Sequence, residues 1–351
     1  MRANAVLLWC AALLAQPAWA QAVLPPLPPT SNAAPLTASQ LAPPAQTTPL
    51  LSPAPLGSPL RAAPVPSAVR PAPLIPARTA SPELIALEQR LAAVAASNPG
   101  EFGIAALDLA SGETVSFNGN EPFPMASTMK VAVAAAYLTE VDAGIRSLDD
   151  QIAGVSAATL MEQMITRSDN RATDLLMNRL GGPAAIDSWL RVRGIGGMRV
   201  DRTIAQLLSD RRDLKDIRDS STPAAMLNLL RMLDTQPVLK PESRLRLLDL
   251  MARCKTGSNR MRALLPAAVK VEHKTGTLTG YTGDVGFLTL PSGRRLAVAF
   301  FARGGSNRPA VIATAARAIF DAFEPGDRST FAAAAQPGAS AESLGGVLLQ
   351  P

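Results

Sequence analysis

A short apolar run directly after a lysine most constrains how this chain can fold. The stretch from Phe123 to Tyr137, FPMASTMKVAVAAAY, predicts a helix in which almost every residue after Lys130 is small or apolar. A helix without a polar face is buried on all sides, so other elements must surround it. Residues i and i+3 of a helix lie on one face, and Lys130 can therefore reach the Ser127 hydroxyl.

Both ends of the chain differ in composition from its middle. Residues 1–20 have a basic start, a short apolar run and an Ala-Trp-Ala site, which predicts a cleaved secretory signal peptide. Residues 21–80 hold 16 of the 31 prolines and only three charged residues, which predicts a disordered Pro/Ala-rich linker. Residues 327–351 predict a disordered tail, so the folded domain is expected at 81–326.

Composition argues against several classes of function. The net charge of +6 comes from interleaved basic and acidic residues, a pattern typical of a solvated surface and not of nucleic-acid binding. His273 is the single histidine of the sequence, whereas a zinc hydrolase site normally uses two or three. We therefore expect no metal or cofactor. His273 itself follows the alternation of a strand to the face opposite its neighbour Lys274, which favours a structural role.

The remaining composition bears on location and redox state. No segment after the signal approaches the roughly 20 apolar residues of a membrane helix. We expect a monomer that is secreted, periplasmic or in the cell envelope, without a stable membrane span after signal cleavage. Cleavage would remove Cys10 and leave Cys254 without a disulfide partner.

The order of helical and strand patterns predicts an α/β fold. Helical periodicity begins at the Ser81 cap, residues 102–117 predict a hairpin, and residues 127–265 are mostly helical. Later elements are expected as strands at 269–276, 283–290 and 295–301 and a closing helix at 310–323. Strands from both ends of the domain would form an antiparallel sheet flanked by helices, with an all-helical subdomain inserted.

Ser127 and Lys130 together suggest a nucleophile and its base. Apolar surroundings lower the pKa of a lysine, and a neutral amine can accept a serine proton. The start of the helix adds N–H donors where an oxyanion would form.

Two later groups offer complementary chemistry. Ser168-Asp169-Asn170 predicts a turn between two helices, and Lys274-Thr275-Gly276 ends a predicted strand. The alternatives are an ordinary Asx-type turn and a strand end with a solvated lysine.

In this order, the three groups resemble those of class A β-lactamases and their penicillin-binding relatives. The flanking strings FPMASTMK, ITRSDNRATDLL, GGPAAIDSWLR, DSSTPAAM and EHKTGT are similar as well, so the resemblance covers residues 81–326. It implies a class A β-lactamase-like, DD-peptidase-like domain that acts without a cofactor.

The resemblance also implies the roles of individual residues. Ser127 would be the acylated nucleophile, Lys130 would take part in its deprotonation, and Ser168 would pass a proton to the leaving nitrogen. The substrate-binding residues would be Asn170, Lys274, Thr275 and Thr277. The oxyanion hole would use the backbone N–H groups of Ser127 and Thr277.

The sequence departs from the family pattern at two places. The family carries a glutamate that activates the deacylating water, but the segment from Asp201 to Asp219 contains none. Counting from its two ends places Ile204 or Gln206 at that position, and Asp210 could substitute only if the loop folded differently. An arginine after the Lys-Thr-Gly strand is also missing, and Arg303 or Arg308 is the candidate to replace it.

Three functions remain open on the sequence alone. The first is a secreted serine hydrolase of class A type that hydrolyses β-lactams, with slow deacylation. The second is a D-alanyl-D-alanine carboxypeptidase or endopeptidase acting on peptidoglycan stem peptides. The third is a sensor of β-lactams or peptidoglycan that is acylated without turnover.

Overall fold

The structure, a computed structural model, describes residues 81–211 and 213–324. The expected signal peptide at 1–20, the linker at 21–80 and the tail at 327–351 lie outside the described residues. Within them, no helix combines the length and apolar character needed to cross a bilayer.

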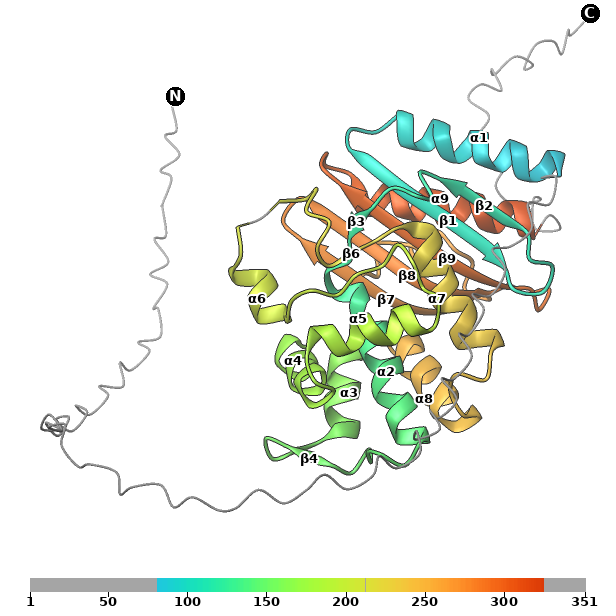
Figure 1. Cartoon of the computed structure of the whole chain (residues 1–351). Coiled ribbons are helices and arrows are strands. Elements are labelled where there is room, and N and C mark those ends of the chain that lie inside the picture. Colours follow the sequence, from blue (N-terminus) through green and yellow to red (C-terminus); the bar gives the residue numbers. More distant parts are fainter. Residues whose placement is uncertain (1–80, 212, 325–351) are drawn as a thin grey trace, which may run out of the picture. The chain divides into compact units, whose positions relative to one another are not determined.

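A five-stranded antiparallel sheet joins the two ends of the described segment (Figure 1). Its strand order is β2-β1-β9-β8-β7. The strands are β1 (Glu101–Asp108), β2 (Thr114–Phe117), β7 (Lys270–Leu278), β8 (Tyr281–Thr289) and β9 (Arg295–Arg303). Because β7 is an edge strand, its outer N–H and C=O groups have no strand partner within the sheet.

Alternate residues of β1 face two separate cores, as the period of a strand requires. Phe102 and Ile104 pack with α1 (Pro82–Ala96) and α9 (Arg308–Phe323) on one face of the sheet. Leu107 belongs to the core that the inserted helices form on the other face. The sheet is therefore the middle of three layers.

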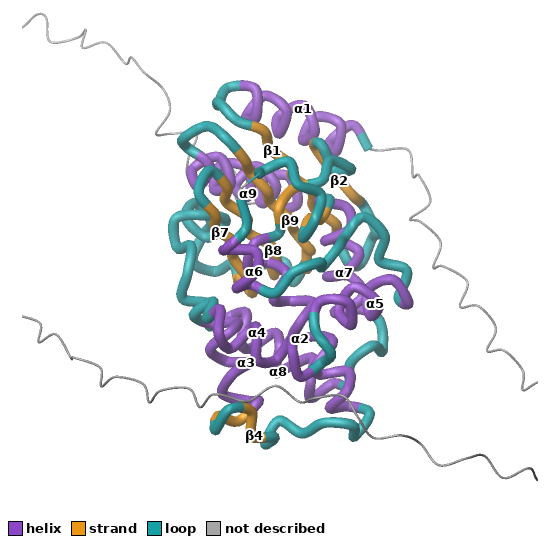
Figure 2. The backbone as a smooth tube through the Cα atoms, turned by 60° about the vertical axis from the view of Figure 1, so that its left-hand side comes forward, coloured by secondary structure: helices purple, strands orange, loops and turns teal. Residues whose placement is uncertain are grey.

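The inserted block lies mainly on the second face (Figure 2). Its helices are α2 (Lys130–Asp142), α3 (Ala157–Thr166), α4 (Asn170–Arg179), α5 (Pro183–Val192), α6 (Ile204–Ser209), α7 (Pro223–Thr235) and α8 (Pro241–Ala252), with the 3₁₀ turn η1 (Ala126–Met129) before α2. Helix α2 is the expected buried helix, since every residue from Lys130 to Leu138 is buried.

The structure confirms the antiparallel sheet with flanking helices and differs from the sequence-based expectation in several details. The inserted block also holds two short strand pairs, β3 (Phe123–Pro124) with β6 (Ser220–Ser221) and β4 (Gln151–Ile152) with β5 (Val155–Ser156). Strand β8 begins two residues earlier than expected, because Thr279 and Gly280 alone make the turn from β7 and Gly280 supplies the positive φ of 79°.

Replacing Gly286 by alanine should destabilise the sheet beside the candidate site. Gly286 pairs with His273, and an added Cβ would lie 2.0 Å from the backbone oxygen of Glu272. We expect Gly286→Ala to lower the free energy of unfolding by about 1–3 kcal/mol, as overpacking does, measured by urea denaturation. Gly196→Ala is the control, because a Cβ there meets nothing within 4 Å; equal stability of the two variants would contradict the close approach of β7 and β8.

Candidate active site

Ser127 lies in η1, at the point where the chain enters α2. It is partly exposed, whereas Ala126 and Thr128 on either side are buried. Ala126 has a φ of 47°, a left-handed conformation that alanine rarely adopts. The strained turn thus presents one hydroxyl at the surface of an otherwise buried element.

Strand β7 passes directly behind this turn. A Cβ added to Gly276 would lie 2.6 Å from the Met125 backbone oxygen and 3.2 Å from the Ala126 Cβ. The glycine after Lys274-Thr275 is therefore required by the close approach of two backbones, and this approach places the end of β7 beside Ser127.

Lys130 is fully buried, and its amine bonds to the turn between α3 and α4. Lys130 Nζ donates to the Ser168 backbone oxygen at 2.7 Å and to Asn170 Oδ1 at 2.8 Å. Longer bonds reach Ser168 Oγ at 3.3 Å and the Asp169 backbone oxygen at 3.4 Å. In the described part of the chain, the Ser127 hydroxyl has no hydrogen bond to this amine.

The surroundings of Lys130 favour its neutral form. Burial is the main cause that lowers the pKa of Lys130 to about 7, and the positive charge of Lys274 lowers it further. Asp169 and Asp174 oppose the change. A large fraction of the amine is therefore uncharged at neutral pH.

The Ser168 turn links the helical block to the sheet. Asp169 caps α4 by accepting from the Ala172 N–H at 2.7 Å, and this cap fixes the turn before it. Ser168 has a φ of 60°, and its Oγ accepts from Lys274 Nζ at 2.9 Å as well as from Lys130. Two lysines from different layers thus meet at one hydroxyl.

Lys274 and its strand neighbours form the other side of the site. Lys274 is fully buried, and its Nζ also donates to the Thr275 backbone oxygen at 2.9 Å. Burial lowers the pKa of Lys274 to about 8, while the charges of Cys254 and Asp284 oppose that change. Thr277, two residues beyond Thr275, is exposed at the mouth of the site.

Arg260 is a site residue that sequence reasoning missed. Its Nη2 donates to Thr277 Oγ1 at 2.6 Å, and its Nη1 donates to the backbone oxygens of Gly276 at 3.0 Å and Gly283 at 2.8 Å. It comes from the irregular segment between α8 and β7, where no periodicity or motif marks it.

The expectation that Arg303 or Arg308 supplies the arginine of the site is wrong. Arg303 pairs with Glu101 at 2.6 Å, and Arg308 donates to the Gly304 backbone oxygen at 2.8 Å. Both guanidinium groups are therefore engaged with partners other than the candidate site residues, whereas Arg260 contacts Thr277 directly.

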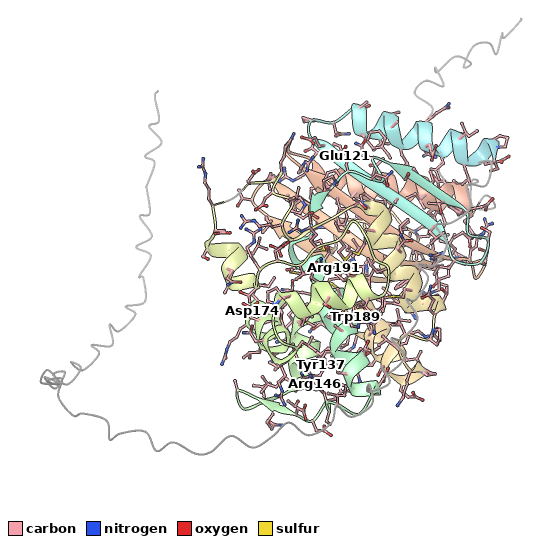
Figure 3. All side chains as sticks on the ribbon, viewed as in Figure 1. Glu121, Tyr137, Arg146, Asp174, Trp189 and Arg191 are labelled. Atoms are coloured by element: carbon pink, nitrogen blue, oxygen red, sulfur yellow. The ribbon has the colours of Figure 1, made fainter. Side chains whose placement is uncertain are left out.

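Hydrogen bonds join the two ends of the loop from Asp201 to Asp219, and the loop contains a short helix. Arg202 Nε donates to Asp219 Oδ2 at 2.6 Å, and the N–H groups of Asp201 and Arg202 donate to Asp219 Oδ1 at 2.8 and 3.0 Å. Helix α6 follows, and Thr203 and Gln206 cap it reciprocally. Asp174 of α4, labelled in Figure 3, accepts the N–H groups of Ile204 and Ala205 at 2.7 and 2.9 Å.

This loop decides between the two positions counted for the missing glutamate. Ile204 is buried in the core, whereas Gln206 is exposed and uses its side chain in the cap. Ile204 therefore holds the inward position. Asp210 does not replace the glutamate, because its carboxylate pairs with Arg202 at 2.6 Å and with Arg218 at 3.4 Å.

His273 is buried on β7, and its Nδ1 lies 2.8 Å from Asp284 Oδ1. Within residues 81–211 and 213–324, no group of three or more His, Cys, Asp or Glu side chains is arranged to hold a metal ion.

The site has known counterparts. The model of the family "Beta-lactamase enzyme family" matches residues 86–323. The carbapenem-hydrolyzing β-lactamase KPC of Klebsiella oxytoca is 32% identical over 243 residues, which cover 62% of this chain and 82% of the relative.

Solved structures agree with the sequence comparison. The last common ancestor of Gram-negative bacteria class A β-lactamase superposes with a TM-score of 0.65 and 38% identity, covering 68% of this chain and 99% of that one. A β-lactamase from Chitinophaga pinensis gives a TM-score of 0.64 and 30% identity, with 68% and 99% covered. The chain therefore belongs to the β-lactamase enzyme family, as a serine hydrolase of the class A type.

Proposed function

We propose that β-lactams acylate Ser127 and that the enzyme releases the acyl group slowly. The observation that carries the acylation step is a partly exposed serine hydroxyl at a helix start, three residues from a buried lysine with a pKa of about 7. A neutral amine so placed can accept the serine proton when the substrate is bound. The Lys130–Ser127 bond that this step needs would form in that complex, since such bonds are often absent before substrate binds.

Ser168 is suited to pass the proton to the leaving nitrogen. A hydroxyl has one hydrogen to donate and two lone pairs to accept with. Lys130 and Lys274 donate to Ser168 Oγ at 3.3 and 2.9 Å, so both lone pairs are in use. The hydroxyl hydrogen remains available for the β-lactam nitrogen.

The substrate carboxylate would bind at the end of β7. Lys274, Thr275, Thr277 and Arg260 supply two cations and two hydroxyls there, and charge-assisted hydrogen bonds to a carboxylate are strong. The N–H groups of Ser127 and Thr277 would form the oxyanion hole, since β7 is an edge strand that approaches η1 closely. Asn170 would hold Lys130 and contact the amide of the substrate.

The isoleucine at position 204 is the reason to expect slow release of the acyl group from Ser127. Deacylation in this family depends on a carboxylate that activates water, and an isoleucine side chain cannot accept a proton. Losing a positioned general base commonly costs about 10²–10⁴-fold in rate. Acylation uses Lys130 and should proceed without that carboxylate.

The same observation favours a second candidate function. D-alanyl-D-alanine peptides also present an amide carbonyl close to a carboxylate, so the groups that would bind a β-lactam can bind them. A D-alanyl-D-alanine peptidase would explain a site equipped for acylation but lacking the loop carboxylate. A protein that is acylated once and stays acylated would be a sensor.

Acylation should occur on Ser127 and nowhere else. When the purified protein is mixed with a penicillin, we expect intact mass spectrometry to show one adduct, which Ser127→Ala abolishes. An adduct that is lost within seconds would contradict slow release, and failure of any adduct to form would contradict the proposed function. If the adduct persists and D-alanyl-D-alanine peptides are cleaved, the peptidase is the better assignment.

Introducing a carboxylate at the inward loop position should accelerate release. We expect Ile204→Glu to speed decay of the acyl-enzyme by roughly 10²–10⁴-fold, followed by the loss of the adduct mass over time. Ile204→Gln is the matched control because it has the same shape without the base. Equal decay in the two variants would show that this position does not act on the water.

The acylation rate should depend on pH through both lysines. Below pH 7 Lys130 is protonated and cannot accept a proton, so the rate should rise with pH as that group, with its pKa of about 7, loses its proton. Above pH 8 Lys274, with its pKa of about 8, loses the charge that binds the carboxylate, so the rate should fall. Lys274→Arg should remove this decrease in rate above pH 8 (the alkaline limb of the pH profile), since arginine stays charged. An unchanged alkaline limb in that variant would contradict the assignment.

A further inference from the structure

Cys254 lies beneath the substrate-binding strand and is connected to it by hydrogen bonds. It follows α8 directly and its side chain is 9% exposed. Cys254 Sγ lies 3.3 Å from Thr256 Oγ1, and that hydroxyl in turn bonds to Thr275 Oγ1. Thr275 also accepts from Lys274 Nζ through its backbone oxygen. Two hydrogen bonds therefore separate the sulfur from a residue of the proposed carboxylate site.

Two further ionisable groups complete a buried row behind β7. His273 Nδ1 lies 2.8 Å from Asp284 Oδ1, and neither residue is more than 1% exposed. The Met261 N–H donates to the other carboxylate oxygen at 3.3 Å. The charge of His273 acts on Cys254 and lowers the pKa of its thiol. The reaction proposed above uses none of these three side chains.

Among the described residues, no carboxylate is hydrogen-bonded to the Lys274 ammonium group, so little negative charge lies close to it. Its hydrogen bonds go to a hydroxyl and a backbone oxygen, and not to a carboxylate. The charged or titratable groups that act on it are Lys130 of α2, Arg260 and Cys254 of the segment before β7, and Asp284 of β8. Lys130 and Arg260 can be cationic, so each anion matters for keeping Lys274 charged.

We propose that Cys254 is a positioning residue for the substrate carboxylate: through Thr256 it orients the Thr275 hydroxyl, and as a thiolate it keeps Lys274 charged. This inference rests on the proposed function, since it deepens the description of the same site. The residue acts on the substrate only through Thr275 and Lys274.

The electrostatics agree with this geometry. Burial alone would raise the pKa of Cys254, but the charge of His273 and the hydrogen bond with Thr256 oppose it, and the pKa is lowered to about 6. Burial would likewise lower the pKa of His273, and Asp284 outweighs it and raises the pKa to about 9. Between these values the sulfur is anionic and the imidazole cationic. The thiolate charge then counteracts the fall in the pKa of Lys274 that burial causes.

The first measurement does not depend on β-lactams. Thiolate ultraviolet absorbance of the purified protein, minus that of Cys254→Ser, should titrate about two pH units or more below an ordinary thiol. A titration above pH 8 would overturn the proposal, whether or not a penicillin acylates the protein. Absence of acylation in the unsubstituted protein would instead count against the proposed function alone.

The second measurement compares charge variants across pH. Cys254→Ser removes the anion at nearly constant size, and Cys254→Asp restores one. We expect Cys254→Ser to move the alkaline limb of the acylation rate by about one pH unit towards lower pH, which is a tenfold loss on that limb, and to raise KM more than it lowers kcat. Cys254→Asp should recover most of the loss. Identical limbs in the protein and Cys254→Ser, or no recovery in Cys254→Asp, would overturn the proposal.

A third variant separates the two parts of the role. Thr256→Val breaks the hydrogen-bond connection but leaves the thiolate in place, so we expect weaker substrate binding with an unshifted alkaline limb. Thermal melting of each variant establishes that it is folded. A shift of the alkaline limb in Thr256→Val equal to that in Cys254→Ser would contradict a charge effect and overturn the electrostatic part.

Discussion

Two buried ammonium groups meeting at one turn of chain are the interaction on which the rest of this structure depends. Lys130 comes from the helical block and Lys274 from the edge of the sheet, and both donate to Ser168. Burying two like charges without a carboxylate between them is costly, and backbone oxygens, a hydroxyl and an amide offset only part of that cost. The remainder is expressed as lowered pKa values of about 7 and about 8. The contact that joins the two layers therefore also leaves the Lys130 amine largely uncharged at neutral pH.

The edge strand β7 must place Lys274 against Ser168 and still leave its outer edge free for a ligand. Its glycine at 276 lets the backbone lie against Met125, which fixes the distance between the turn that carries Ser127 and the strand. The segment before β7 supports it, since Arg260 bonds to the backbone oxygens of Gly276 and Gly283 and Thr256 bonds to Thr275. These supports arrive from outside the sheet, so they hold the strand without occupying the edge that a substrate amide would use.

The sequence was sufficient for those parts of the site whose residues are close together in the chain. Ser127 and Lys130 are three residues apart, Ser168 and Asn170 two apart, and Lys274 and Thr275 adjacent. Each group was therefore visible as a short motif, and the order of the three motifs, through the family resemblance, predicted that they belong to one site. Arg260 could not be predicted in this way, because two of its three partners on β7 and β8 are backbone oxygens, which any residue type offers. The choice between Ile204 and Gln206 also needed the structure, since it depends on which side chain caps α6 and which is buried. Asp174 was missed for the same reason, as its bonds to α6 cross 30 residues or more of chain.

The loop that lacks the family glutamate is nevertheless fully supported. A hydrogen bond from Arg202 to Asp219 joins the two ends of the loop. Thr203 and Gln206 cap its helix, and Asp174 accepts hydrogen bonds from the first two N–H groups of that helix. None of these supports uses the side chain at position 204, so the shape of the loop and the chemistry of its inward residue are physically separable. The fold can therefore keep the framework that positions a deacylating base while presenting an apolar side chain in its place. Under the proposed function, acylation would be unaffected by the side chain at position 204, and only release of the acyl group would change.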